Sequence, residues 1–137
     1  MVTFTLNRRK ITTRKDFVVK VPSYLLPVGQ LSEGIEVSSE PQEVVTRDGE
    51  SKTSQVFPGQ AWKIGVKYVL SERETTRNDV TVVDRETRGG SVTVWSQVKP
   101  LVSEGDVVTF ENVMTGAFAP QDGNALQFVQ ATNVKEA

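Results

Sequence analysis

The sequence contains neither cysteine nor histidine, and these two absences remove much of the side-chain chemistry that enzymes use. Without cysteine there is no disulfide framework, no thiolate nucleophile and no thiolate metal site. Without histidine there is no Ser-His triad, no imidazole base and no imidazole ligand for zinc. The acidic residues are spread over several segments of the chain. We therefore expect a protein that is not an enzyme and that carries no catalytic residue, metal or cofactor.

Long apolar runs are also missing, and no stretch of eighteen apolar residues could form a transmembrane helix. The first ten residues place their charges after a short apolar part, which is the reverse of the order in a secretory signal. The lack of cysteine fits a reducing compartment. These observations predict a cytoplasmic protein with no membrane partner. A length of 137 residues suits one domain with an extension.

Net charge is only −1, but the charges are segregated along the chain. Residues 1–20 hold six Lys or Arg against one Asp, whereas residues 31–50 hold one Arg against six acids. Residues 51–100 hold eight Lys or Arg against five acids, and residues 101–137 hold one Lys against five acids. This pattern allows a basic face on an acidic protein, which is what a phosphate backbone would sense. Ordinary solvated surface is the alternative interpretation.

Hydrophobic residues alternate in several short segments, which predicts β-strands and no long helix. The clearest segment runs from Trp62 to Leu70, with Trp62 and Tyr68 on its apolar face. Asn78-Asp79 and Arg88-Gly89-Gly90 are expected to form turns. The further strands expected in this half are 80–84, 92–96, 107–110 and 125–131.

Three motifs in the second half resemble a known family. They are Val94-Trp95-Ser96, then Gly105-Asp106-Val107-Val108, and the closing Phe128-Val129-Gln130-Ala131. Together they resemble OB-fold single-stranded DNA-binding proteins of plasmids, conjugative elements and phages of Gram-positive bacteria. The resemblance implies an all-β protein with an OB-fold-like five-stranded Greek-key barrel in residues 58–137. Residues 1–57 would form an N-terminal arm and additional strands that pack on or extend this barrel.

The resemblance also implies a function, which is to coat single-stranded DNA with little sequence preference during replication, conjugation or phage growth. RNA remains open as the partner in place of DNA, and no small-molecule substrate is expected. Single-strand binders combine a basic groove with aromatic platforms for the bases. Mapping the OB groove onto the sequence gives the candidate nucleic-acid-binding residues Lys63, Lys67, Arg73, Arg77, Arg85, Arg88, Trp95, Lys99 and Phe118.

Two of these candidates have an alternative structural role. If Val92 and Val94 point into the barrel, Trp95 points out into the groove, and the opposite register or a bulge would place it in the core. Phe118 is expected in a loop, Thr115 to Pro120, where it would either stack on a base or plug one end of the barrel.

The N-terminus carries a further alternation, with Val2, Phe4 and Leu6 on one side of a predicted strand. Such a strand can add to a sheet edge of a neighbouring molecule, so we expect self-association through this oligomerisation arm. Two other classes of protein remain open. One is a protein-binding or structural β-domain, such as a phage or plasmid assembly component, and the other is an OB-fold that binds oligosaccharide or protein.

Overall fold

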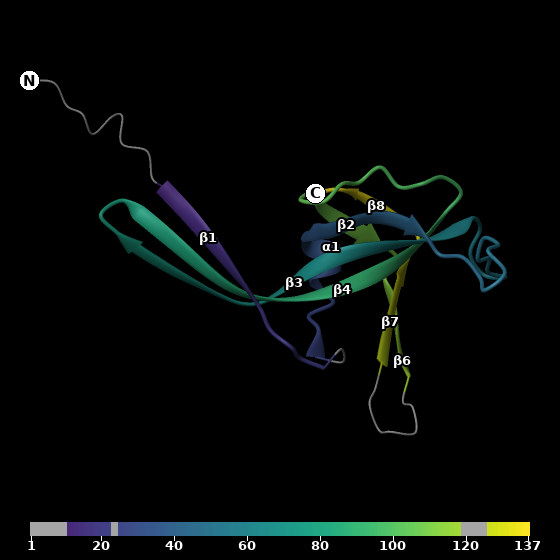
Figure 1. The fold of residues 1–137 in the computed structure, drawn as a ribbon, viewed down its shortest axis with the longest axis horizontal. Coiled ribbons are helices and arrows are strands. Elements are labelled where there is room, and N and C mark those ends of the chain that lie inside the picture. The colour runs from purple at the N-terminus through teal and green to yellow at the C-terminus, as the bar shows by residue number, and fades with distance from the viewer. Residues whose placement is uncertain (1–10, 23–24, 119–125) are drawn as a thin grey trace, which may run out of the picture.

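The computed structural model describes residues 11–22, 25–118 and 126–137, which are almost entirely β-strand (Figure 1). The strands are β1 (Ile11–Val18), β2 (Ile35–Glu43), β3 (Gln60–Arg77), β4 (Val80–Ser96), β5 (Val107–Glu111), β6 (Met114–Phe118), β7 (Leu126–Ala131) and β8 (Asn133–Glu136). One short helix, α1 (Gln30–Glu33), precedes β2. The prediction of an all-β fold is confirmed.

All eight strands belong to one mixed sheet. The strand order is β6-β7-β4-β3-β2-β5-β8, and β1 pairs with β4 outside this path. The β1·β4 and β4·β7 ladders are parallel, and the other ladders are antiparallel. The path is open at its ends, because β6 and β8 form no ladder with each other in the described part of the chain.

A long hairpin of β3 and β4 dominates the sheet, and its pairing runs from Gln60 opposite Ser96 to Arg77 opposite Val80. Asn78 and Asp79 link the two strands with φ angles of 53° and 63°. Positive φ at both central residues is the signature of a tight type I′ hairpin turn, so this predicted turn is confirmed.

The second predicted turn is wrong, because Arg88, Gly89 and Gly90 lie inside β4. The two strands expected at 80–84 and 92–96 are therefore one continuous strand. Gly90 serves packing instead of chain reversal. A Cβ atom at this position would lie 2.6 Å from Cε2 of Tyr68, so glycine leaves the space that the buried ring occupies.

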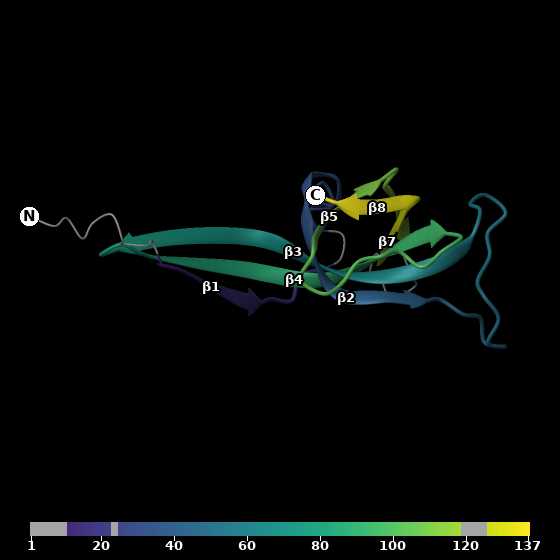
Figure 2. The same ribbon diagram turned by 90° about the horizontal axis from the view of Figure 1, so that it is seen from above.

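The far half of this hairpin projects from the rest of the molecule as a narrow arm (Figures 1 and 2). We define the arm as β1, residues 71–77 of β3 and residues 80–87 of β4. In it β1 lies beside β4, with Ile11 opposite Val80 at the tip and Val18 opposite Thr87 at the base. The oligomerisation residues Val2, Phe4 and Leu6 precede β1 and lie outside the described residues.

The core lies at the other end of the hairpin, where β2, β3, β4, β5 and β7 contribute buried residues together with α1. Its members are Leu31, Ile35, Val37, Ile64, Val66, Tyr68, Val92, Val94, Val108, Phe110, Val129 and Ala131. The alternation of β3 places Ile64, Val66 and Tyr68 inside, as predicted, while Trp62 is half-buried. The first core strand, β2, comes from residues that the sequence assigned to the N-terminal extension.

The last four strands pair as one bent hairpin. Phe110 pairs with Val134 in the β5·β8 ladder, and Met114 pairs with Gln130 in the β6·β7 ladder. The two ladders continue the same residue-to-residue pairing of two chain segments, and only a short interruption separates them. At the interruption Asn112 has a φ of 54° and donates a hydrogen bond from Nδ2 to Oγ1 of Thr132 at 2.8 Å. The bend therefore separates two halves of a continuous pair of chain segments.

Candidate nucleic-acid interface

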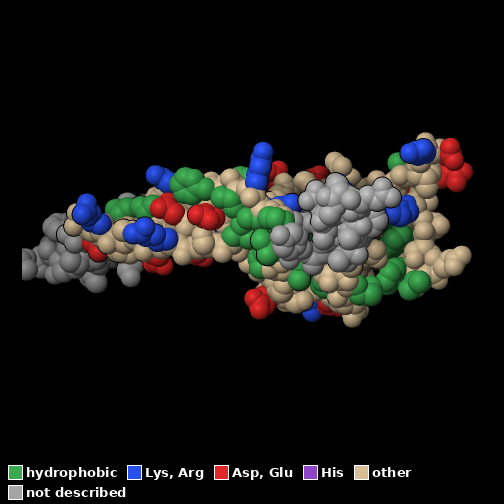
Figure 3. Space-filling view, turned by 90° about the horizontal axis from the view of Figure 1, so that it is seen from below, with side chains coloured by type: hydrophobic (Ala, Val, Ile, Leu, Met, Phe, Trp, Pro, Cys, Tyr) green, Lys and Arg blue, Asp and Glu red, His purple; other side chains and the backbone are tan. Residues whose placement is uncertain are grey.

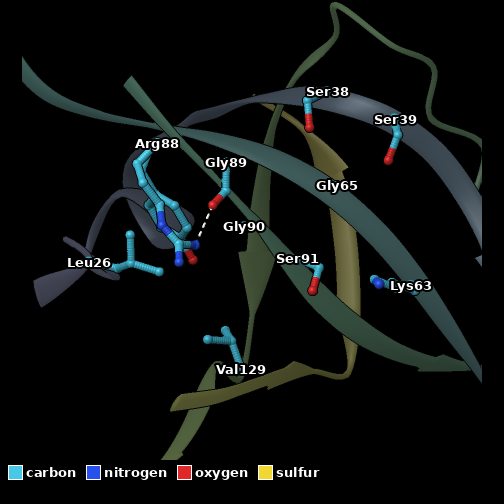
Figure 4. Close-up of a pocket in the computed structure, with 11 residues that line it drawn as sticks. Leu26, Ser38, Ser39, Lys63, Gly65, Arg88, Gly89, Gly90, Ser91 and Val129 are labelled. Atoms are coloured by element: carbon cyan, nitrogen blue, oxygen red, sulfur yellow. Dashed lines mark hydrogen bonds between the residues drawn. The ribbon is translucent and has the colours of Figure 1, made fainter. Parts of the chain in front are cut away.

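A hollow of about 440 Å³ lies across β2, β3 and β4, at the point where β4 passes from the arm to the core. Figure 4 shows Arg88 and Leu26 on one side of it and Lys63 and Ser91 on the other, with Gly90 between them. We call it the Lys63–Arg88 hollow. Its remaining lining residues are Ser38, Ser39, Gly65, Tyr68, Gly89 and Val129. Among the described residues, its lining has two cations, three serines and three glycines but no carboxylate.

The two cations of this hollow have no acidic partner among the described residues. Lys63 lies on the exposed side of β3. Arg88 donates a hydrogen bond from its guanidinium to the carbonyl oxygen of Gly89, its neighbour in the chain (Figure 4). Because neither positive charge contacts a carboxylate of the described residues, the described lining of the hollow is positively charged.

Tyr68 adds a phenol hydroxyl to the polar groups of the hollow. Its side chain is fully buried, and its hydroxyl has no hydrogen-bond partner within the described ranges. Burial raises the pKa of Tyr68 to about 12, although the nearby charge of Arg88 acts in the opposite direction. The hydroxyl is thus protonated at neutral pH and remains a free donor. An unpartnered buried donor is costly, which favours a ligand or a water at this position.

Close packing of β2 against β3 forms the floor of the hollow. The β2·β3 register shifts between Val37 and Ser39 and again between Ser39 and Gln42. This irregularity places Ser38 and Ser39 directly over Gly65, where any side chain would overlap the Ser39 hydroxyl. Glycine at position 65 therefore allows two serine hydroxyls to approach the β3 backbone.

Trp95 lies on the face opposite to the core valines, but it is not an open platform. Val92 and Val94 point into the core, which is the first of the two orientations considered from the sequence. Trp95 is nevertheless only 7% exposed, because the ring of Phe57 stacks on it with centroids 6.0 Å apart and planes at 16°. Its indole Nε1 donates to Oε1 of Gln130 at 3.3 Å. The exposed aromatic surface is thus that of Phe57, not Trp95.

The loop between β2 and β3 holds Phe57 in this position. Ser54 Oγ accepts hydrogen bonds from the backbone N–H groups of Val56 at 3.1 Å and Phe57 at 3.3 Å. Two residues later Gly59 has a φ of +89°, and a Cβ atom there would lie 2.6 Å from the backbone nitrogen of Gln97. Glycine therefore permits the loop to pack against the end of β4, beside Trp95.

Two predicted binding residues, Lys67 and Arg85, are committed to ion pairs instead. Asp16 of β1 accepts from Arg85 Nε at 2.8 Å and from Lys67 Nζ at 3.0 Å. Glu36 of β2 contacts the same Lys67 at 3.0 Å and Arg14 at 3.1 Å. This charge network joins four strands at the base of the arm. Its two carboxylates offset much of the positive charge that the sequence assigned to nucleic acid.

The pKa values in this network reflect the same contacts. The hydrogen bond from Arg85, assisted by Lys67, holds the pKa of Asp16 well below its usual range despite a smaller opposing effect of burial. The hydrogen bond with Asp16 is the largest cause that raises the pKa of Lys67, followed by that with Glu36. Asp16 also raises the pKa of Arg85. All three groups are therefore charged in their pairs at neutral pH.

The structure does not bring the other predicted residues to the hollow. Arg73 and Arg77 were predicted in an OB loop that flanks the groove, but they lie in the exposed part of β3 within the arm. On the face drawn in Figure 3, basic and acidic side chains are interspersed along the arm and form no stripe of one sign. Lys99 is exposed in the connection between β4 and β5. Phe118 ends β6 instead of lying in a loop, and its side chain is outside the described part.

Sequence reasoning missed Phe57, Tyr68, Gln130 and the two serines of β2 as residues of the site. Tyr68 was assigned to the core, which is correct for its ring but not for its unpartnered hydroxyl. Phe57 lies next to Pro58-Gly59, and an aromatic beside such a chain break was a signal that could have been used. The serines and Gln130 carry no local signal, because only strand pairing brings them to the site.

No protein-family model and no curated protein matches the sequence. Within the described ranges, no group of three or more His, Cys, Asp or Glu side chains is placed to hold a metal ion. No helix among these residues has both the length and the apolar character needed to span a membrane.

Proposed function

We propose that this protein binds single-stranded DNA, without catalysis, across β3 and β4. One observation carries the proposal, namely the Lys63–Arg88 hollow, whose described lining has two cations without an acidic partner, an unpartnered Tyr68 hydroxyl and no carboxylate. Phosphate groups are recognised by such a combination of Lys, Arg, hydroxyl and backbone donors. The aromatic pair of Phe57 and Trp95 lies farther along the same hairpin. Bases stack on aromatic side chains whatever their identity, so the stacking itself would add little sequence preference.

The strand pairing supports an OB-type barrel as the scaffold of this site. The β5·β8 and β6·β7 ladders continue the same residue-to-residue pairing. We therefore count β5 and β6 as one bent strand, and β7 and β8 as another. With this counting, which is part of the proposal, β2 pairs with β3, β3 with β4, β4 with β7/β8, and β5/β6 with β2. In this assignment β2 is strand one, and β3 and β4 are strands two and three. The OB ligand face is formed by strands two and three, where the hollow lies.

Cooperative coating of the strand forms part of this proposal. The oligomerisation segment with Val2, Phe4 and Leu6 is joined to β1, whose Ile11 lies at the tip of the arm. A strand attached there can reach a sheet edge of a neighbouring molecule. Deletion of residues 1–10 should therefore abolish higher oligomers on DNA in analytical ultracentrifugation while single-site binding persists. Unchanged assembly would exclude a role of this segment.

A protein-binding β-domain is the second candidate, and the arm is the observation that favours it. Phe17 and Val18 at the end of β1 are 52% and 83% exposed. Exposed apolar residues on a projecting strand are suited to contacts with another protein. In that case the Lys63–Arg88 hollow would have no part in the main interaction.

Fluorescence-anisotropy titration of a labelled single-stranded DNA oligonucleotide at low and moderate salt tests the proposal. Binding should weaken as salt rises. Lys63→Ala and Arg88→Ala should each weaken binding several-fold without changing the thermal midpoint. Lys135→Ala is the matched control, because it removes the same charge from β8, where Lys135 is paired with Glu111. Absence of binding at low salt would exclude the proposal, and equal effects of all three variants would exclude this hollow.

A further inference from the structure

A second hollow, of about 410 Å³, lies between the loop that carries Phe57 and the β6–β7 hairpin. Its walls are Val56, Phe57, Met114, Thr115, Gly116 and Gln130. We call it the Phe57 hollow. Val56 and Met114 are among the exposed large apolar side chains of the protein, so the walls are apolar and open to solvent. Gln130 is the lining residue that brings an amide group into these walls.

The orientation of the Gln130 amide is determined by its hydrogen bond to Trp95. An indole N–H can only donate, so the group that faces Trp95 must be the amide oxygen, Oε1. The NH₂ group of Gln130 is therefore turned away from Trp95, and it has no acceptor in the described part of the chain. In the described part of the chain the Phe57 hollow is thus a mainly apolar site whose amide has its oxygen turned to Trp95 and its NH₂ donors turned away from it.

A flat heteroaromatic ring fits the walls of this hollow. Phe57 is half-buried, with one face held against Trp95 and the rest of its ring available to the hollow. Stacking of a base on an aromatic side chain is worth about 1–3 kcal/mol. Gly90 and Trp95 are five residues apart on β4, which corresponds to about 17 Å in an extended strand. One oligonucleotide can therefore contact both hollows, whereas a single nucleotide cannot.

We propose that the Phe57 hollow receives one nucleobase and that Gln130 favours keto bases over amino bases. This inference depends on the proposed function. On their base edges guanine and thymine present a carbonyl oxygen, O6 or O4. At the corresponding ring position adenine and cytosine present an NH₂ donor, N6 or N4. The NH₂ group of Gln130 complements the carbonyl and opposes the amino group. The usual bidentate pairing of Gln with adenine needs both the amide oxygen and the NH₂ group to face the base, whereas here the oxygen faces Trp95.

The test uses four oligonucleotides with the same abasic backbone and one central base: thymine, cytosine, guanine or adenine. The comparisons are thymine with cytosine and guanine with adenine, because each pair is matched in ring size. The gain or loss of about one hydrogen bond predicts a preference of roughly threefold to tenfold for the keto base in each pair, measured by competition anisotropy.

Two substitutions of Gln130 isolate its role. Gln130→Met keeps the volume but removes the amide, so both preferences should disappear while binding of all four oligonucleotides persists. Gln130→Glu offers only acceptors, so the preference should reverse towards cytosine and adenine even though the added charge weakens binding. Circular dichroism and thermal midpoints establish that both variants are folded. Lys63→Ala is the control for the phosphate contact and should weaken binding of all four equally.

Two results would overturn this inference. The first is equal binding of keto and amino bases by the unchanged protein, and the second is a keto preference that survives in Gln130→Glu. Either result leaves the proposed binding of single-stranded DNA intact, because the oligonucleotides still bind. Failure of all four to bind, together with failure of ordinary single-stranded DNA, would instead refute the proposed function itself.

Discussion

Substitution of the adjacent glycines 89 and 90 by alanine tests whether β4 is continuous. Gly90→Ala would place a Cβ atom 2.6 Å from Cε2 and 3.2 Å from Cδ2 of Tyr68. The Tyr68 ring is fully buried in the core, so it cannot move away without displacing its neighbours. Overpacking of this kind costs about 1–3 kcal/mol. We expect Gly90→Ala to lower the free energy of unfolding by this amount.

Gly89→Ala is the matched control, because the two glycines share the same strand and the same chemical change. A Cβ atom at position 89 would have no neighbour within 4 Å, and the φ of Gly89 lies outside the positive range that alanine disfavours. Alanine there reduces the freedom of the unfolded chain, which stabilises by about 0.4–1 kcal/mol. The two variants should therefore differ by roughly 1.5 to 4 kcal/mol.

Urea denaturation followed by circular dichroism measures both variants, with the midpoint and slope fitted for each. The slopes should be equal, so that the difference in midpoint reports stability. If Arg88-Gly89-Gly90 formed a turn with positive φ, Gly89→Ala would be strongly destabilising. A loss of stability in Gly89→Ala equal to that in Gly90→Ala would therefore refute the continuous strand and the packing argument together.

Two further predictions concern the base of the arm and the aromatic pair. Asp16→Asn removes the charge that Arg85 and Lys67 contact and should lower the free energy of unfolding by about 1–2 kcal/mol at pH 7 in urea denaturation. The pKa of Asp16 is depressed in the folded state. The stability that its charge contributes is therefore complete above the ordinary Asp pKa of about 3.9 and is lost as pH falls below it. The difference in free energy of unfolding between the unchanged protein and Asp16→Asn should thus narrow from pH 5 to pH 2. Trp95→Ala removes the stack with Phe57 and should destabilise by about 3 kcal/mol in the same assay, whereas a change below about 0.5 kcal/mol would mean that Trp95 is surface.

The sequence predicted those parts of the fold that depend on neighbours in the chain. Alternation alone places Ile64, Val66 and Tyr68 on the inner face of β3, because side chains of a strand point to opposite faces in turn. Asn78-Asp79 was predictable as a turn because these residues tolerate positive φ. Both inferences need only local geometry.

The predictions that failed concern contacts between residues that are distant in the sequence. The local sequence predicts a turn at Gly90, but Tyr68 of the neighbouring strand is what requires a glycine there. The faces of Val94 and Trp95 followed from alternation, yet the burial of Trp95 follows from Phe57, which is 38 positions earlier in the chain. No pattern within a strand contains information about a loop that folds over it.

A count of basic residues does not predict nucleic-acid binding, because contacts with distant residues decide which cations are unpaired. Lys63 and Lys67 are four positions apart on β3, and the sequence treats them alike. The structure separates them, because Lys67 contacts Asp16 and Glu36, whereas Lys63 faces the hollow without an acidic partner in the described part of the chain. A cation that already has a carboxylate partner releases few counterions when DNA binds. Only unpaired cations should therefore contribute to the salt dependence of binding.

The variants Lys63→Met and Lys67→Met test this difference through the salt dependence of DNA binding. Each phosphate contact on a single strand contributes about −0.7 to the slope of log K against log salt concentration. Lys63→Met should reduce the magnitude of the slope by about 0.7 and leave the urea midpoint unchanged. Lys67→Met should do the opposite, because it leaves Asp16 and Glu36 facing each other with one cation fewer. Equal changes of slope in the two variants would show that the ion pairs of Lys67 open on binding, and that the resting structure does not decide which cations contact DNA.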